Sequence, residues 1–278
     1  MMRAFFTLAL ACGLLAGTAS AARADLPSTT IDLAVSTGSL QPGAVYGPWQ
    51  FATLSARSIA GRDKPGISLT TRRDGDAAAP SYGTSLAIDD YHQFSSATFG
   101  YASVQASSGS IFPTRGAYAE FDGTLREGLV LGAGAGIDVE PDGLVQRYVS
   151  VGPTVYFPHG NATARYLPLW TQGQVGASSW LANLSLGDEG RSVLSFDLQD
   201  GVAPAFSATD PTLASRFADR SFVLGVSLRR WLTPRLGWSA GLETGSERDR
   251  ATGATAYTRT SVSLGLFVGV GHAPAATP

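Results

Sequence analysis

Strict alternation of apolar and small polar side chains near the C-terminus is the feature that most restricts the fold of this chain. In residues 236–245, Leu236, Trp238 and Leu242 occupy alternate positions and glycine or serine fills most of the positions between them. Residues 255–270 repeat the pattern. Successive side chains leave opposite faces of a strand, so this period of two predicts β-strands. One aliphatic face and one small, polar face, in segments of about ten residues, are typical of a transmembrane β-barrel.

The same alternation recurs along the chain and predicts about 14 strands, an even number that suits a single-chain membrane barrel. The expected strands are residues 31–36, 49–59, 67–72, 82–89, 96–106, 116–124, 129–139, 144–157, 162–171, 177–186, 192–200, 221–231, 236–245 and 255–270. Twelve strands is the alternative if residues 31–36 do not form a full wall strand, or if Pro168 breaks the run at residues 162–171.

The connections between these strands sort by length. Every second connection is short: residues 62–66, 91–95, 125–128, 157–161, 187–190 and 232–235. The connections between them include longer ones, at residues 38–47, 74–80, 107–114, 201–218 and 248–253. Outer-membrane barrels have short periplasmic turns and longer extracellular loops. We therefore predict an all-β, antiparallel up-and-down transmembrane barrel whose N-terminus lies in the periplasm.

The first 24 residues read as a secretory signal peptide, with Arg3 before a short apolar core and an Ala-x-Ala ending. We expect cleavage after Ala24, with Ala21 as the alternative, and a single barrel domain at residues 25–278. A lipid anchor on Cys12 is a weaker alternative, because the apolar core continues beyond it. No later segment has the roughly 20 apolar residues of a membrane-spanning helix. These features predict export through the periplasm to the outer membrane of a Gram-negative bacterium.

Composition excludes several classes of function. The chain has 20 basic and 22 acidic residues, and Lys64 is the only lysine, so no basic stripe for nucleic acid is present. Removal of Cys12 with the leader would leave no thiol for disulfides or catalysis. Thirty-three glycines with only 15% charged residues are unusual for a water-soluble enzyme but suit a closely packed wall that faces lipid.

Several short motifs occur along the chain: Tyr101, the Ser-Ser-Gly-Ser-Ile-Phe-Pro run at residues 107–113, Gly-Ala-Tyr-Ala-Glu at 116–120, and residues 149–157 with Arg165-Tyr166. In these motifs the chain resembles the YaiO family of outer-membrane β-barrel proteins. The last strand lacks the terminal aromatic residue that the family leads one to expect. The resemblance implies an outer-membrane location and a link to the biosynthesis or export of surface polysaccharide. It implies no established reaction and carries over no functional residues.

Nine charged residues fall on the polar faces of their strands and are candidates for lining the lumen. They are Arg72, Asp89, Glu120, Asp122, Asp138, Asp197, Arg229, Glu243 and Arg259. One interpretation is structural, because charges inside a closed barrel must be paired or solvated. The other is a pore lining that selects permeants by charge. We favour the structural interpretation.

An enzyme would need a serine and a histidine held in contact by a third polar group. His92 with Ser95 or Ser96 is the best candidate pair, and His159 and His272 are the remaining histidines. A turn histidine in water is the simpler interpretation, so we predict that the protein is not an enzyme. We also expect no cofactor and no metal, since His, Asp and Glu show no ligand spacing.

Aromatic residues near strand ends predict girdles at the two membrane interfaces. They are Trp49, Trp170, Trp180, Trp231, Trp238, Tyr82, Tyr156, Tyr166 and Phe222. Arg147 and Arg230 fall on the lipid face close to strand ends, where a charge is tolerated.

Three functions are compatible with these features. The favoured one is a porin-like passage or accessory for a surface polysaccharide or small solutes. The alternatives are a barrel enzyme acting on lipid or lipopolysaccharide, and a structural or adhesive barrel that uses residues 201–218. The expected partners are outer-membrane lipids and lipopolysaccharide, the barrel-assembly machinery during insertion, and surface polysaccharide.

Overall fold

The computed structural model describes residues 27–41, 48–74, 81–171, 174–201, 219–249 and 252–271, which form fourteen strands. The strands are β1 (Thr29–Gln41), β2 (Trp49–Ser58), β3 (Gly66–Asp74), β4 (Ser81–Gln93), β5 (Thr98–Gly109), β6 (Arg115–Arg126), β7 (Leu129–Val139), β8 (Val145–Phe157), β9 (Gly160–Thr171), β10 (Gln174–Asp188), β11 (Ser192–Gly201), β12 (Asp219–Thr233), β13 (Leu236–Asp249) and β14 (Thr255–Val270). Within these residues, no helix is long and apolar enough to span a bilayer.

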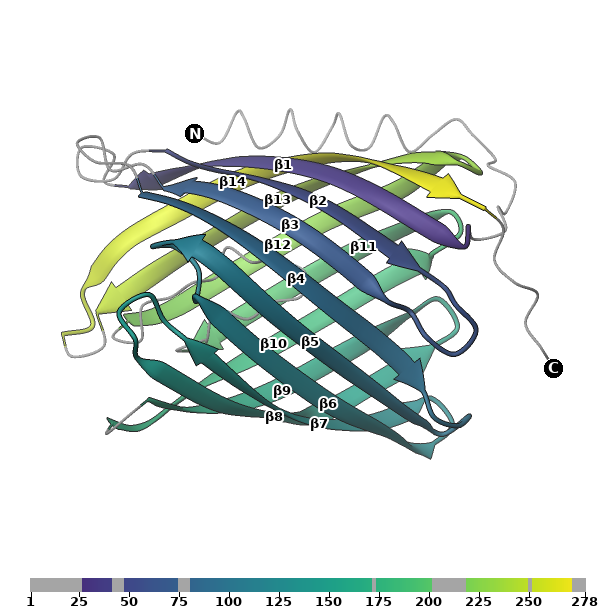
Figure 1. Ribbon diagram of the computed structural model, residues 1–278, viewed down its shortest axis with the longest axis horizontal. Helices are drawn as coiled ribbons and strands as arrows, with labels where there is room; N and C mark the ends of the chain where they lie inside the picture. The colour runs from purple at the N-terminus through teal and green to yellow at the C-terminus, as the bar shows by residue number, and fades with distance from the viewer. Residues whose placement is uncertain are drawn as a thin grey trace.

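Each strand pairs antiparallel with its neighbours in the sequence, and the sheet closes on itself (Figure 1). Closure joins β1 to β14, from Thr29 opposite Val270 to Gln41 opposite Thr258. The predicted 14-strand barrel is confirmed. The twelve-strand alternative is wrong, because β9 pairs with both β8 and β10 in spite of Pro168.

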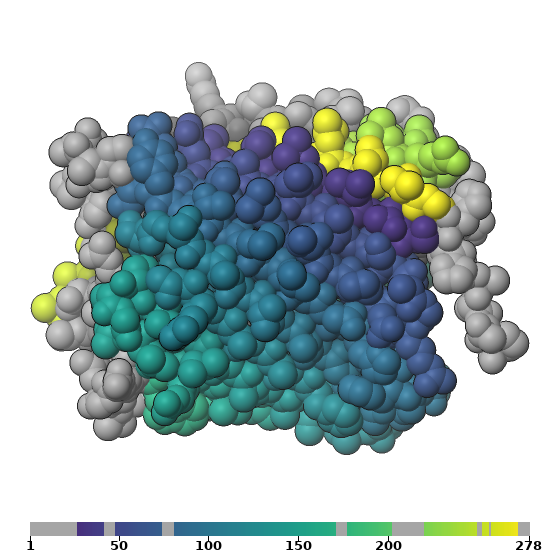
Figure 2. Space-filling model, viewed as in Figure 1, coloured from purple at the N-terminus to yellow at the C-terminus, as the bar shows by residue number. Residues whose placement is uncertain are grey.

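The two faces of the wall differ as the alternation predicts. Aliphatic side chains such as Leu33 and Leu264 are exposed on the outer surface, part of which is seen in Figure 2. The inner surface buries polar side chains, and Ser179 is 0% exposed. Water-soluble domains bury their aliphatic side chains and expose polar ones. The reverse arrangement suits a wall with lipid outside and a polar interior.

Several strands are longer than the sequence indicates. β1 continues to Gln41, so the predicted loop at residues 38–47 begins too early, and β4 continues to Gln93 through part of a predicted turn. Gly38 and Ser39 are typical turn residues, yet they pair with Ser261 and Thr260 of β14. Inside a closed barrel the available ladder partners override local turn preference.

Short turns at one end join β2 to β3, β4 to β5, β6 to β7, β8 to β9, β10 to β11, and β12 to β13. We call this the short-turn end and the opposite one the loop end. The loop end also has some short connections, such as residues 172–173 between β9 and β10. The predicted signal peptide, its cleavage site, Cys12, His272 and residues 202–218 lie outside the described residues.

The prediction that Trp49 and Trp231 belong to interfacial girdles is wrong. Their side chains are 2% and 5% exposed and point into the barrel. Gly38 of β1 leaves room for the Trp49 ring, because a side chain on residue 38 would collide with that ring. Tyr82, Trp170, Trp180 and Phe222 are exposed at outward positions. Strand-end location alone therefore does not distinguish a girdle residue from an inward one.

Candidate functional site in the barrel lumen

The nine charged residues expected in the lumen all occupy inward positions, alternating along their strands with exposed outward residues. They do not converge on one site. Most form separate pairs with residues on strands nearby: Asp89 with Arg57, Arg229 with Asp32, Glu243 with Arg259, and Glu120 and Asp122 with Arg165.

On one side of the lumen, formed mainly by β5–β9, large side chains fill the space; we call it the filled side. Tyr118 and Tyr148 stack with ring centroids 6.0 Å apart, and Tyr101 lies 6.1 Å from Tyr118. Leu169 and Ala177 complete the buried cluster. Apart from Tyr101, these residues belong to one row across six strands, with Ser103, Tyr118, Gly136, Tyr148, Leu169 and Ala177 as successive cross-strand partners.

The glycines of β7 make this packing feasible. A side chain on Gly134 would meet the Tyr118 ring, and one on Gly136 would meet the Tyr148 ring. The tyrosines of β6 and β8 therefore pack over β7 at Gly134 and Gly136, where its inner face carries no side chain. Glycine at alternate positions here provides space for neighbouring side chains, not a hollow.

Arg165 binds two carboxylates beside this cluster. Its guanidinium lies 2.9 Å from Glu120 Oε1 and 3.5 Å from Asp122 Oδ1, and it also donates to the carbonyl of Gly152 at 2.9 Å. Tyr118 donates its hydroxyl to Glu120 as well. All three charged side chains are largely buried. Two acids and one base give the group one net negative charge on the filled side.

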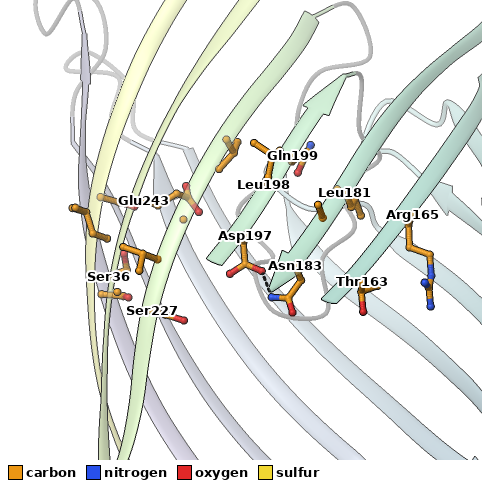
Figure 3. Close-up of a pocket in the computed structure, with 18 of the residues that line it drawn as sticks. Ser36, Thr163, Arg165, Leu181, Asn183, Asp197, Leu198, Gln199, Ser227 and Glu243 are labelled. Atoms are coloured by element: carbon orange, nitrogen blue, oxygen red, sulfur yellow. Dashed lines mark hydrogen bonds between the residues drawn. The ribbon is translucent and has the colours of Figure 1, made fainter. Parts of the chain in front are cut away.

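The other side, formed by β10–β14 with β1 and β2, contains a cavity of about 340 Å³; we call it the hollow side. The cavity extends to Thr163 and Arg165 of β9, where it meets the filled side (Figure 3). A row of small inward residues crosses six strands there. The row runs Ser185, Ser195, Ser227, Gly241, Ser263 and Ser36. Most of the inward side chains that line the cavity are polar (Figure 3).

Two polar features on β10 and β11 mark the cavity wall. Asn183 donates to Asp197 Oδ1 at 2.8 Å (Figure 3). Ser185 donates to Asn183 Oδ1 at 3.0 Å. Gln199, two residues from Asp197, is 3% exposed. Neither the amide nitrogen nor the amide oxygen of Gln199 has a hydrogen-bond partner among the described residues. A buried amide without a partner costs free energy, which a polar solute in the cavity would offset.

Arginines and aromatic rings flank the cavity along the strands. Towards the loop end, Trp49 stacks on Phe51 and packs against the guanidiniums of Arg72 and Arg259 at 5.2 and 5.7 Å. Towards the short-turn end, Arg229 lies 3.6 Å from the centroid of the Phe267 ring, which contacts Trp231 edge-on. Along the strands, the row of small residues therefore lies between two groups of arginine and aromatic side chains.

The sequence did not single out Asp32, Arg57, Arg165 or the inward tyrosines. Alternation alone does place Arg57 and Asp32 on the inward faces of their strands, because they lie two residues from Ser55 and Ala34. Arg165 was missed because Pro168 made residues 162–171 look irregular. Asp138, one of the predicted residues, is buried near Gln105, whose amide lies 3.5 Å from it.

The candidate catalytic pair is not assembled. His92 binds the carboxylate of Asp63 at the short-turn end. Ser95 instead bonds Thr98 Oγ1 at 2.8 Å and accepts from the amide of Ala97. Among the described residues, no hydrogen bond joins His92 to Ser95 or Ser96. No described group of three or more His, Cys, Asp or Glu side chains is arranged to hold a metal ion.

Comparison with known proteins places this barrel in a family. Residues 29–206, covering β1–β11, match the model of the YaiO membrane beta barrel domain. The chain belongs to the YaiO family. The resemblance stated from the sequence is thus confirmed. The hollow side takes strands β12–β14 from beyond the matched segment, whereas the filled side lies wholly within the YaiO domain.

Solved structures show the same fold at low identity. The monoaromatic hydrocarbon channel CymD superposes with a TM-score of 0.60 at 9% identity, over 90% of each chain. The Pseudomonas putida toluene transporter TodX gives 0.57 at 10% identity, over 88% of this chain and 91% of TodX. No curated protein sequence matches the chain. These likenesses establish an outer-membrane-type barrel and nothing about its cargo.

Proposed function

We propose that this YaiO-family barrel is a non-enzymatic passage for small polar solutes, in particular sugars and fragments of a surface glycan, across the outer membrane of a Gram-negative bacterium. The carrying observation is the unpartnered, buried amide of Gln199 on the wall of the 340 Å³ cavity. Amide and hydroxyl groups can both donate to and accept from the hydroxyls of a sugar.

The charges of the lumen support a solute with little charge of its own. Glu243 is paired with Arg259 at 2.7 Å, and Arg165 is held by Glu120 and Asp122. Asp197 is bonded to the neutral amide of Asn183. A cavity wall on which these charges are paired and Asp197 faces a neutral partner favours neutral or weakly cationic solutes over anions.

Swelling of liposomes that contain the refolded protein tests this proposal. Neutral sugars of increasing length should enter up to a size limit. Gly225→Leu should lower the rate to roughly half or less by narrowing the cavity. The substitution fits locally, because a Cβ at Gly225 would lie 3.6 Å from the nearest atom, Cβ of Asp197.

Gly123→Leu is the matched control, because Gly123 lies on the outer face and a Cβ there meets nothing within 4 Å. Liposomes that contain this variant should swell at the wild-type rate. Folded wild-type protein that admits no sugar would sink the proposal. Toluene uptake faster than into protein-free liposomes, with no entry of sugars, would show a cargo like those named for CymD and TodX.

The proposed assembly route follows from the fold. We infer that the chain crosses the periplasm after signal-peptide removal and that the barrel-assembly machinery inserts it. A barrel exposes unpaired strand edges until it closes, so unassisted insertion into hydrocarbon is unfavourable.

A further inference from the structure

The outer wall carries a groove of about 590 Å³ over β14, β1, β2 and β3 that reaches Tyr82 of β4. β1–β4 lie in the purple and blue part of the wall in Figure 2. The floor of the groove is one row of cross-strand partners: Leu264, Val35, Ala52 and Thr71. The side chain of Ala52 is shorter than those of its cross-strand neighbours Val35 and Thr71, so the outer surface is indented at this level. The floor is mostly apolar, as an acyl chain requires.

A second row borders the groove on its loop-end side and is mainly polar, with Val262 as its apolar member. Its members, in order across the strands, are Val262, Thr37, Gln50, Arg73 and Tyr82. Gln50, Arg73 and Tyr82 are exposed on the face that otherwise carries aliphatic side chains. An apolar floor below a polar margin matches an amphiphile that lies along the wall with its head towards the loop end.

Arg73 is the charged group of this margin. Its guanidinium lies 5.8 Å from the centroid of the Tyr82 ring, which holds it over the wall. It forms no ion pair with any described residue. An arginine on the lipid face is unfavourable in hydrocarbon and is stabilised by an anion at the interface.

The outward charges at the two ends of the wall also favour an anion at the loop end. Among the described strands, the loop end carries Arg73, Arg115, Arg147, Arg220 and Arg248 on the outer face, with Asp200 as the acid. The short-turn end carries Arg126 and Arg230, balanced by Asp90 and Asp188. On the outer face of the described strands, the loop end is therefore the more basic one, as expected for contact with an anionic leaflet.

We propose that the groove binds one lipopolysaccharide molecule of the outer leaflet. A lipid A phosphate accepts hydrogen bonds from Arg73 and from the amide of Gln50. An acyl chain lies over Leu264, Val35 and Ala52. Arginine suits this role, because its planar guanidinium can donate two hydrogen bonds to one phosphate. The site is on the outer wall and is independent of any passage through the lumen.

Binding of purified lipopolysaccharide to the refolded, detergent-solubilised full chain tests the headgroup contact. Arg73→Gln should weaken binding about tenfold, the order expected for losing one charged hydrogen-bonded contact. Arg147→Gln is the matched control: it removes the same charge from the outer face near the same end, at a position outside the groove. It should change affinity less than about twofold.

A second pair of variants tests the acyl-chain contact without touching charge. Ala52→Leu should fill the floor of the groove and weaken binding several-fold. Ala133→Leu makes the same change on the outer face of β7 and should leave binding unchanged. The mobility of unheated protein on denaturing gels verifies that each variant has folded.

Three outcomes would overturn the proposal. Equal weakening by Arg73→Gln and Arg147→Gln would show general charge attraction. Wild-type affinity in both Arg73→Gln and Ala52→Leu would show that the groove is empty. Equal competition by inorganic phosphate, or by phosphatidylglycerol vesicles, would show a general anion or phospholipid site.

Discussion

The filled and hollow sides of the lumen are built from the same alternating strands, yet only one of them leaves a cavity. Both contain inward glycines: Gly134 and Gly136 on β7, and Gly225 and Gly241 on β12 and β13. On β7 the tyrosines of the two neighbouring strands cover the glycines. Around Gly241 the cross-strand neighbours Ser227 and Ser263 are also small. A hollow thus requires a row of small residues across several strands, and the composition of one strand does not decide it.

The largest expected difference is in how much the free energy of unfolding falls when a charged residue is replaced. Arg165→Met leaves Glu120 and Asp122 buried without their cation, and should lower the free energy of unfolding by about 3–5 kcal/mol. Urea-induced unfolding in lipid vesicles would measure this. Arg220→Met is the matched control, since Arg220 pairs with Asp200 and both side chains are exposed, at 60% and 38%. It should cost no more than about 1 kcal/mol. Similar losses of unfolding free energy in the two variants would show that the Arg165 group stabilises the barrel no more than an exposed ion pair does.

Removing a ring should convert part of the filled side into a hollow. Tyr148→Ala should destabilise the barrel by about 3 kcal/mol and raise its single-channel conductance, because the Tyr118–Tyr148 stack closes that part of the lumen. Tyr82→Ala, on the outer face, should leave conductance unchanged. Unaltered conductance in a folded Tyr148→Ala protein would mean that the remaining side chains still block this side.

On the hollow side we expect selectivity to change while stability does not. Asp197→Asn keeps the shape of the side chain and removes its charge, so any cation preference of the conductance should fall, with stability changing by less than about 1 kcal/mol. Reversal potentials in a salt gradient give the measurement. Asp200→Asn, an outward change at the loop end, should have no effect on them.

The last expected effect is a dependence of stability on pH at the loop end of the filled side. Burial, with Asp138 and Asp142 nearby, raises the pKa of Glu140 to about 7. A raised pKa means that the folded state binds this proton more tightly than the unfolded state does. The resulting stabilisation is present at low pH and is lost as the pH rises through about 7. Glu140→Gln should flatten this slope, which unfolding midpoints at about pH 5 and about pH 8 would reveal. An identical slope in both proteins would contradict it.

The architecture could be predicted from the sequence because it depends on a local property. Alternation fixes which face each residue takes, and the order of strands in an up-and-down barrel follows the order of the chain. The strand ends were less accurate, as at Gly38 and Ser39, because cross-strand partners decide where pairing stops.

The interior could be predicted only in part. Alternation identifies Tyr118 and Tyr148 as inward residues, but it does not show that they meet above Gly136. That contact depends on the register of three strands, which the sequence does not state. The same limit applies to the row of small residues around Gly241, and hence to the cavity and to Gln199.

The pairing of β1 with β14 has a consequence for biogenesis. Thr29 pairs with Ser58 of β2 on one side, but its partner on the other side is Val270, near the opposite end of the described chain. Both edge strands keep rows of unpaired backbone donors and acceptors until the last strand has been delivered. Contacts between such distant segments are slow to form. The polypeptide must therefore be protected against premature edge-to-edge association on its way to the membrane, and loss of either terminal strand should abolish insertion, not merely shorten the wall.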